Sequence, residues 1–198
     1  MTIISLVILV ITLGAQILFL RFFRFNLRNT NLLRIYEYIF YFSIFAVFSL
    51  LIYYSYQQYI AWASVEPSKF LLPPYQSIDY FIKYIGARFF TPYLISLISA
   101  LVFFYVAQIL NKKYEERFFD SEELWLGALA IFLIGWPGAF FYFIGLIIFY
   151  FLLSTFYFLL HGKNHRLSLY YLWLPLAIFV ILINKWLIEL GLWKLLKI

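Results

Sequence analysis

The chain contains no cysteine and few charged residues, and both shortages limit what it can be. Without a thiol it has no disulfide framework, no thiolate nucleophile and no cysteine-ligated zinc or iron–sulfur cluster. Charged residues make up 12% of the 198 residues, against 66% hydrophobic residues. A soluble domain is about one-quarter charged, so this composition excludes a water-soluble fold.

Most of the other residues are apolar, and 25% of all residues are aromatic. Aromatic side chains gather at membrane–water interfaces, which suits a chain that crosses them repeatedly. A helix needs roughly 20 apolar residues to cross a hydrocarbon core about 30 Å thick, so this length leaves no room for a separate soluble domain. We therefore predict an all-α polytopic membrane protein, with residues 1–198 forming a single transmembrane domain.

The hydrophobic runs predict six membrane-spanning helices. We place them at 3–20, 35–56, 89–110, 118–135, 139–160 and 169–183. The apolar stretch 124–160 is divided at Gly135-Trp136-Pro137-Gly138, because proline cannot donate a backbone hydrogen bond and glycine permits a turn. The segment 57–88 holds Pro67, Pro73 and Pro74 among many aromatic residues, and we expect an aromatic flap along the outer interface.

The distribution of basic residues predicts which side each loop faces. The first span has no Lys or Arg before it and four arginines just after it, which predicts a retained span with its N-terminus outside the bacterial inner membrane. Six spans leave nine Lys and Arg inside and six outside, whereas five spans would leave ten and five. Charge alone favours five spans, but a single span over 124–160 would leave an unusually long apolar run. The tail that ends at Lys194 and Lys197 is expected to be amphipathic.

Few residues offer metal or acid–base chemistry. His161 and His165 are four residues apart, a spacing that can hold zinc on a helix, but Gly162 and Asn164 favour a turn there. We therefore expect a loop that contacts lipid phosphates, and neither a metal nor another cofactor.

Carboxylates give two weaker hypotheses. A prepilin-peptidase-like aspartyl protease needs two adjacent carboxylates, but the only aspartates, Asp79 and Asp120, fall on opposite faces of the predicted topology. Glu37 lies near the inner end of the second span, where it is either a functional group or the partner of Arg34 or Lys112 at the interface.

Arg88 is the best candidate for binding a ligand. It begins the third span, and a guanidinium at headgroup depth can bind a lipid phosphate through two hydrogen bonds. Glutamine amides nearby could hold glycerol or carbonyl oxygens, and the alternative is an ordinary interfacial anchor. The candidate lipid-binding residues are Arg88, Gln57, Gln58, Tyr54 and Trp136. A net charge of +6 favours anionic headgroups, and no nucleic acid is expected as a partner.

Three segments between 35 and 143 resemble the bacterial prolipoprotein diacylglyceryl transferases, which move diacylglycerol from phosphatidylglycerol to a lipoprotein cysteine. Phe48-Ser49-Leu50-Leu51-Ile52-Tyr53-Tyr54 is similar to the family's Gly-Ala-Arg segment followed by a tyrosine. Gly86-Ala87-Arg88-Phe89-Phe90-Thr91-Pro92 resembles Gly-Leu-Ser-Phe-His-Gly-Gly, and Gly135-Trp136-Pro137-Gly138-Ala139-Phe140 resembles Gly-Arg-x-Gly-Asn-Phe. The matching frame consists of Gly86, Phe89, Gly135, Gly138 and Phe140.

The departures from that family fall on its reactive residues. The family's histidine corresponds to Phe90, its signature arginine to Trp136 and its asparagine to Ala139. An indole has neither the charge nor the paired donors of a guanidinium. The resemblance therefore implies a relative without the catalytic residues that still binds phospholipid or lipoprotein.

Two other functions stay open. One is a non-enzymatic structural or assembly subunit that packs against other membrane helices, with Gly127, Ala128 and Ala130 as the best small-residue group for close helix contact. The other is an active phospholipid-dependent transferase with a rearranged site.

Overall fold

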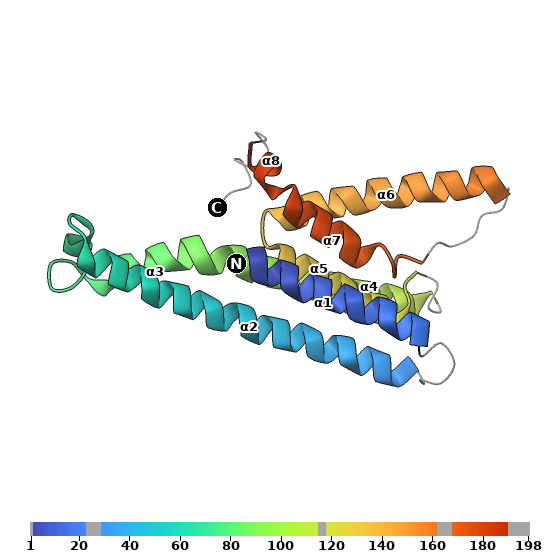
Figure 1. Cartoon of the computed structure of the whole chain (residues 1–198), viewed down its shortest axis with the longest axis horizontal. Helices are drawn as coiled ribbons and strands as arrows, with labels where there is room; N and C mark the ends of the chain where they lie inside the picture. The colour runs from blue at the N-terminus through green and yellow to red at the C-terminus, as the bar shows by residue number, and fades with distance from the viewer. Residues whose placement is uncertain (1, 23–28, 115–117, 162–167, 190–198) are drawn as a thin grey trace.

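The computed structural model describes residues 2–22, 29–114, 118–161 and 168–189, and every regular element within these ranges is a helix (Figure 1). This confirms the predicted all-α class. The elements are α1 (Thr2–Phe22), α2 (Asn29–Ser64), η1 (Ser68–Leu71), α3 (Ile78–Ile85), the π-helical turn η2 (Gly86–Phe90), α4 (Thr91–Lys113), α5 (Ser121–Ile134), α6 (Gly138–His161), α7 (Trp173–Leu182) and α8 (Asn184–Glu189).

Three helices in the described part of the chain are long and apolar enough to cross a membrane. They are Leu33–Ser64, the continuous α3–η2–α4 helix Ile78–Lys113, and Gly138–Leu160. Shorter apolar helices cover Thr2–Leu18 and Trp173–Leu182. The 10 residues of α7 reach about 15 Å, half of the hydrocarbon core. Six full-length spans are therefore not shown.

Helix α5 forms the centre of the bundle. It packs against α4, α2, α7, α1 and α6, and the residues from Leu126 to Leu133 are all buried. The helix is apolar on every side, as expected for one that neighbours surround completely. It begins at Ser121, after an N-cap at Asp120, and so later than the predicted start at 118. It ends at Ile134, and α6 begins at Gly138, which confirms the predicted break.

The second and third spans are longer than predicted. Helices α2 and α3–η2–α4 lie antiparallel, and their hairpin reaches beyond the N-terminus of α1 and the start of α6 (Figure 1). Each contains 36 residues, about 54 Å of helix. The segment 57–88, expected to be an interfacial flap, is helical at both of its ends, and only 65–77 lies between the two long helices. Gln57 and Gln58 are compatible with a helix, so their polarity did not mark its end.

Aromatic packing holds the far end of the hairpin together. The ring of Trp62 lies 5.3 Å from that of Phe81 and 4.7 Å from that of Tyr84. Tyr59 meets Phe81 edge-on at 5.5 Å. Together with the buried side chain of Leu72, these contacts form a small second core outside the main bundle.

Proline explains the π-helical turn η2. Pro92 has no N–H to donate to the carbonyl of Arg88, four residues earlier, and its ring would press against that carbonyl in a regular α-helix. The chain widens here instead, and the backbone N–H of Thr91 donates to the carbonyl of Gly86, five residues earlier. The Thr91 hydroxyl donates to the same carbonyl at 2.9 Å. The helix thereby continues past the proline without a break.

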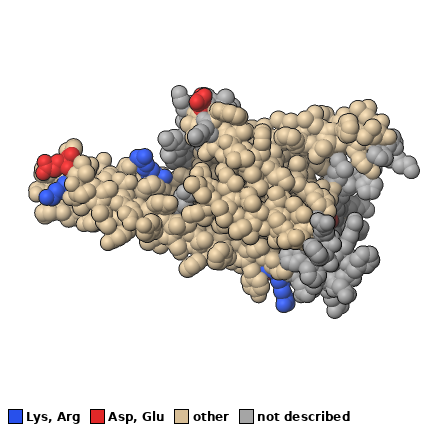
Figure 2. Space-filling model, in the orientation of Figure 1, with Lys and Arg blue, Asp and Glu red and all other residues tan. Residues whose placement is uncertain are grey.

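Helix α6 leaves the bundle after its first turns. Ala139 and Tyr142 are buried, and the Tyr142 hydroxyl donates to the carbonyl of Trp173 at 3.1 Å. From Ile147 to Leu160 no side chain is buried, and α6 runs on the opposite side of α7 from α1 (Figure 1). Figure 2 shows few charged groups on this face of the molecule, with acidic and basic groups at the hairpin end and a few others at its upper and lower edges.

Gly127 permits the closest helix contact in the core. A Cβ at this position would lie 2.6 Å from Cε1 of Phe103 and 3.0 Å from Cζ3 of Trp173, closer than van der Waals contact.

We expect Gly127→Ala to lower the free energy of unfolding by about 1–3 kcal/mol through overpacking. Thermal unfolding in detergent measures the change. Gly14→Ala is the matched control, because nothing lies within 4 Å of a Cβ there. Equal stability of the two variants would contradict this packing.

Candidate functional site

Arg88 lies on the surface of the α3–η2–α4 helix, within the π-helical turn. Its Nη1 donates to the Tyr84 hydroxyl at 2.6 Å, and its guanidinium carbon lies 5.6 Å from the centre of the same ring. Tyr84 in turn stacks against Trp62 on α2 at 4.7 Å. The arginine is therefore exposed, yet one side of it is positioned by an aromatic ring that the opposite helix supports.

The predicted glutamines lie farther along the hairpin than Arg88. Contacts of Phe48 with Phe90 and of Tyr59 with Phe81 set the register of α2 against the other helix. That register puts Arg88 level with the turn of α2 near residue 51, about 10 Å along the axis from Gln58. The fold brings the two residues onto one hairpin without direct contact.

Tyr54 and Gln57 are both exposed on α2. The Gln57 amide donates to the Tyr53 hydroxyl at 3.1 Å, so its interaction is within its own helix. Gln58 is half-buried. Three of the predicted lipid-binding residues thus share one segment of α2.

Trp136 lies beside the first turn of α4, close to η2. Its backbone N–H donates to the carbonyl of Pro92 at 3.2 Å. Gly135 has a φ of 76°, a left-handed conformation that favours glycine, and a Cβ there would lie 3.7 Å from the ring of Tyr93. The turn 135–138 and Arg88 therefore lie near the same level of the bundle.

The other frame residues differ in their surroundings. Gly138 is buried where α6 begins, whereas Phe140 is exposed. Phe89 is half-buried and packs against both cores. A Cβ on Gly86 would have nothing within 4 Å, so space alone does not require glycine there.

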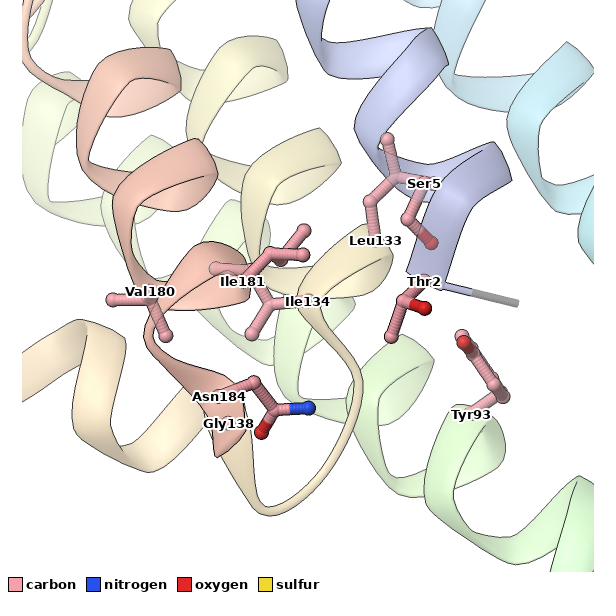
Figure 3. A pocket seen from close by; sticks show the side chains of 9 residues that line it. All are labelled: Thr2, Ser5, Tyr93, Leu133, Ile134, Gly138, Val180, Ile181 and Asn184. Atoms are coloured by element: carbon pink, nitrogen blue, oxygen red, sulfur yellow. The ribbon is translucent and has the colours of Figure 1, made fainter. Parts of the chain in front are cut away.

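A small cavity lies where α1, α4, α7 and the turn 135–138 meet (Figure 3). It measures about 20 Å³, which is the room of about one water molecule. Polar groups of Thr2, Ser5, Tyr93 and Asn184 line it together with apolar side chains. A cavity of this size can hold a bridging water but not a lipid headgroup.

Glu123 lies in the first turn of α5, at the end of the helix away from this cavity, and its side chain is 0% exposed. One carboxylate oxygen accepts hydrogen bonds from the Ser168 hydroxyl and from the backbone N–H of Tyr170 at 2.8 Å. The other accepts from the backbone N–H of Asp120 at 3.3 Å, which completes a capping box with the Asp120 side chain.

The same network extends to α1 and α2 through Tyr170. Its hydroxyl lies 2.7 Å from that of Tyr36, and its carbonyl accepts from the Gln16 amide at 2.7 Å. On the neighbouring side, Asn111 of α4 exchanges two hydrogen bonds with the backbone of Phe119, at 2.6 and 3.0 Å. These bonds fix the entrance to α5 against α1, α2, α4 and the segment before α7, so their role is structural.

The sequence analysis missed this network, although one signal for part of it was present. Asp120 and Glu123 have the Asp-x-x-Glu spacing of a capping box, which predicts a helix start at Ser121. Nothing local indicates that Ser168 and Tyr170, more than 40 residues later, complete it.

The structure separates the two aspartates of the aspartyl hypothesis and describes one of the two histidines of the metal hypothesis. Among the described residues no group of three or more His, Cys, Asp or Glu could hold a metal ion. His161 ends α6, while His165 lies outside the described residues. Asp79 and Asp120 lie at opposite ends of the α3–η2–α4 helix, about 50 Å apart by its rise per residue, so they cannot share a proton.

The remaining polar predictions have mixed outcomes. Glu37 is half-buried and Arg34 is exposed on α2, and no contact between them is described. Lys194 and Lys197, in the predicted amphipathic tail, lie outside the described residues.

Comparisons with known proteins give no relative. No protein-family model, no curated protein and no solved structure matches the chain.

Loss of the Glu123 carboxylate should weaken the whole bundle. In Glu123→Ala the Ser168 hydroxyl and the Tyr170 backbone N–H lose the acceptor that joins them to α5, at a cost of about 0.5–1.5 kcal/mol for each hydrogen bond. We expect Glu122→Ala, one residue away and only half-buried, to lose far less stability. Thermal unfolding of both variants in the same detergent compares them. A Glu123→Ala variant as stable as Glu122→Ala would rule out the carboxylate as an anchor.

Proposed function

We propose that the chain is an integral protein of a bacterial inner membrane that binds an anionic phospholipid through Arg88. The observation that carries this is the placement of Arg88 on a helix of spanning length, exposed and oriented by the Tyr84 hydroxyl. A guanidinium has five N–H donors, and this contact uses one of them. The others can form the paired hydrogen bonds that a phosphate accepts.

The neighbourhood of Arg88 suits a headgroup better than a reaction. Tyr84 contacts Arg88 and packs against Trp62, and the Trp136 backbone bonds that of Pro92 one helical turn away. Aromatic residues of this kind favour the membrane interface. A lipid phosphate at this level would meet a cation, while its acyl chains would lie along the exposed apolar faces of α2 and α4.

We further propose that the chain is a relative of the prolipoprotein diacylglyceryl transferases that lacks their activity. At the position of the family's histidine, Phe90 packs against Phe48 with 6.3 Å between the ring centres. At the position of its asparagine, Ala139 is buried in the helix core. Both positions contribute apolar packing, and neither offers a group that moves a proton or stabilises a leaving phosphate. A lipid-binding role, with phospholipid or a lipidated chain as partner, accords with this. In this proposal the N-terminus of the chain lies outside the bacterial inner membrane.

A structural or assembly subunit is the second candidate. The exposed surface of α6 favours it, because none of its most apolar stretch is buried inside the chain. Helices of partner proteins could cover that surface, since association in lipid depends on close van der Waals packing.

Native mass spectrometry of the gently extracted protein tests the lipid proposal. We expect wild type to retain phosphatidylglycerol, and Arg88→Ala to retain about tenfold less, because loss of a charge-assisted hydrogen bond reaches this magnitude. Lys83→Ala is the matched control, since it removes an exposed cation five residues away on the same helix.

Equal loss in both variants would mean that general charge attraction, and not Arg88, holds the lipid. No retained phospholipid in wild type, together with a stoichiometric protein partner, would replace the lipid proposal with the assembly subunit.

A further inference from the structure

We propose a second phospholipid site at the other end of the α3–η2–α4 helix, in a cavity between α2, α4 and α5. The cavity measures about 390 Å³, within the range of small-molecule pockets. Its lining includes Leu33 of α2, Phe104, Gln108 and Lys112 of α4, and Ser121 and Trp125 of α5. Lys112 lies 24 residues beyond Arg88, about 36 Å along the helix, so the two sites are separate.

Three polar side chains form one rim of this cavity. Gln108 and Lys112 are four residues apart on one face of α4, and Ser121 begins α5 opposite them. Within the described part of the chain, none of the three has a hydrogen-bond or ion-pair partner. Asn111 differs, because both ends of its amide are occupied by the backbone of Phe119. The rim therefore offers an ammonium, an amide and a hydroxyl to a ligand.

No carboxylate is among the described residues that line the cavity, and two of those nearby, Asp120 and Glu123, have hydrogen-bond partners elsewhere. Ser121, Leu124 and Trp125 share one face of α5, and Glu123 lies about 160° around the helix from Ser121. Glu123 and Asp120 both accept hydrogen bonds from Ser168, which belongs to the segment before α7. Lys112 is the one charged side chain among the described residues that line the cavity, so the cavity favours an anion.

Apolar side chains form the rest of the cavity and continue beyond it. The rings of Phe104 and Trp125 pack 4.4 Å apart beneath the polar rim. On the surface of α4, Leu101 and Tyr105 are exposed, and they share a helix face with Lys112. A ligand with its anionic head at Lys112 would have an apolar track along a helix of spanning length.

This combination fits a phospholipid better than a free anion. The phosphate would pair with the Lys112 ammonium, and the Gln108 amide and Ser121 hydroxyl would hold ester or glycerol oxygens. An acyl chain would cover Phe104 and the exposed stripe of α4. Inorganic phosphate would gain only the first of these interactions.

Lipid counting by native mass spectrometry tests this site separately from the Arg88 site. The protein is released from bicelles that contain phosphatidylglycerol and phosphatidylcholine, as wild type, Lys112→Ala, Arg88→Ala and the double variant. We expect Lys112→Ala to lose one bound phosphatidylglycerol whether or not Arg88 is present, with occupancy down about tenfold. Lys113→Ala is the matched control, because its side chain lies over the ring of Tyr114 and outside the cavity lining.

Gln108→Ala gives a second, uncharged probe of the same rim and should also lower occupancy. A Lys112→Ala protein that retains as much phosphatidylglycerol as Lys113→Ala would overturn the site. Equal loss of phosphatidylcholine would overturn anionic recognition, and inorganic phosphate that binds as well as the lipid would overturn the phospholipid assignment. If only Arg88→Ala loses lipid, this site fails while the Arg88 proposal stands. If only Lys112→Ala loses lipid, the Arg88 proposal fails while this site stands.

Discussion

Enclosure of α5 is the constraint on which the rest of the structure depends. A helix that is buried on all sides keeps its backbone hydrogen bonds internal along its length, but its ends still present polar groups that need partners. At one end the capping box of Asp120 and Glu123 supplies them, while Asn111 bonds the flanking backbone of Phe119 and the Ser168 hydroxyl donates to the Glu123 carboxylate. At the other end Gly135 turns the chain directly into α6.

Packing around α5 depends on fit more than on hydrophobicity. Lipid is as apolar as the helix surfaces, so helices associate in it through close contact and hydrogen bonds. Gly127 lets the rings of Phe103 and Trp173 approach the α5 backbone, and the Ser96 hydroxyl bonds the Ile131 carbonyl at 2.8 Å. The small residues noted in the sequence therefore serve contacts within this chain. The exposed stretch of α6 offers the contrasting surface, where no side chain from Ile147 to Leu160 is buried inside the chain.

Local chemistry in the sequence predicted some of this architecture. The all-α class follows from composition, and the break before α6 follows from the glycines and proline at 135–138. The length of the α2–α3 hairpin did not follow, because polar residues such as Gln57 and Gln58 mark the edge of a hydrophobic run and not the end of a helix. Pro92 did not mark the start of a helix either, because the π-helical turn before it lets the helix continue through the proline.

The candidate sites were predictable to a similar degree. The sequence identified Arg88 because a cation at the end of an apolar run is expected at the membrane interface, and the side chain is exposed in the structure. The Glu123 network and the cavity at Lys112 each join residues from segments distant in sequence, and an almost uniformly apolar chain gives no periodicity that pairs its helices.

Photolabelling from within the bilayer tests the central position of α5 most directly. A phospholipid with a carbene precursor in the middle of its acyl chain is reconstituted with the protein, and the labelled peptides are identified by mass spectrometry. The account predicts strong labelling of α6 between Ile147 and Leu160 and none between Leu126 and Leu133 of α5. Labelling of α5 equal to that of α6 would show that α5 faces lipid, and would contradict the enclosed helix on which the account rests.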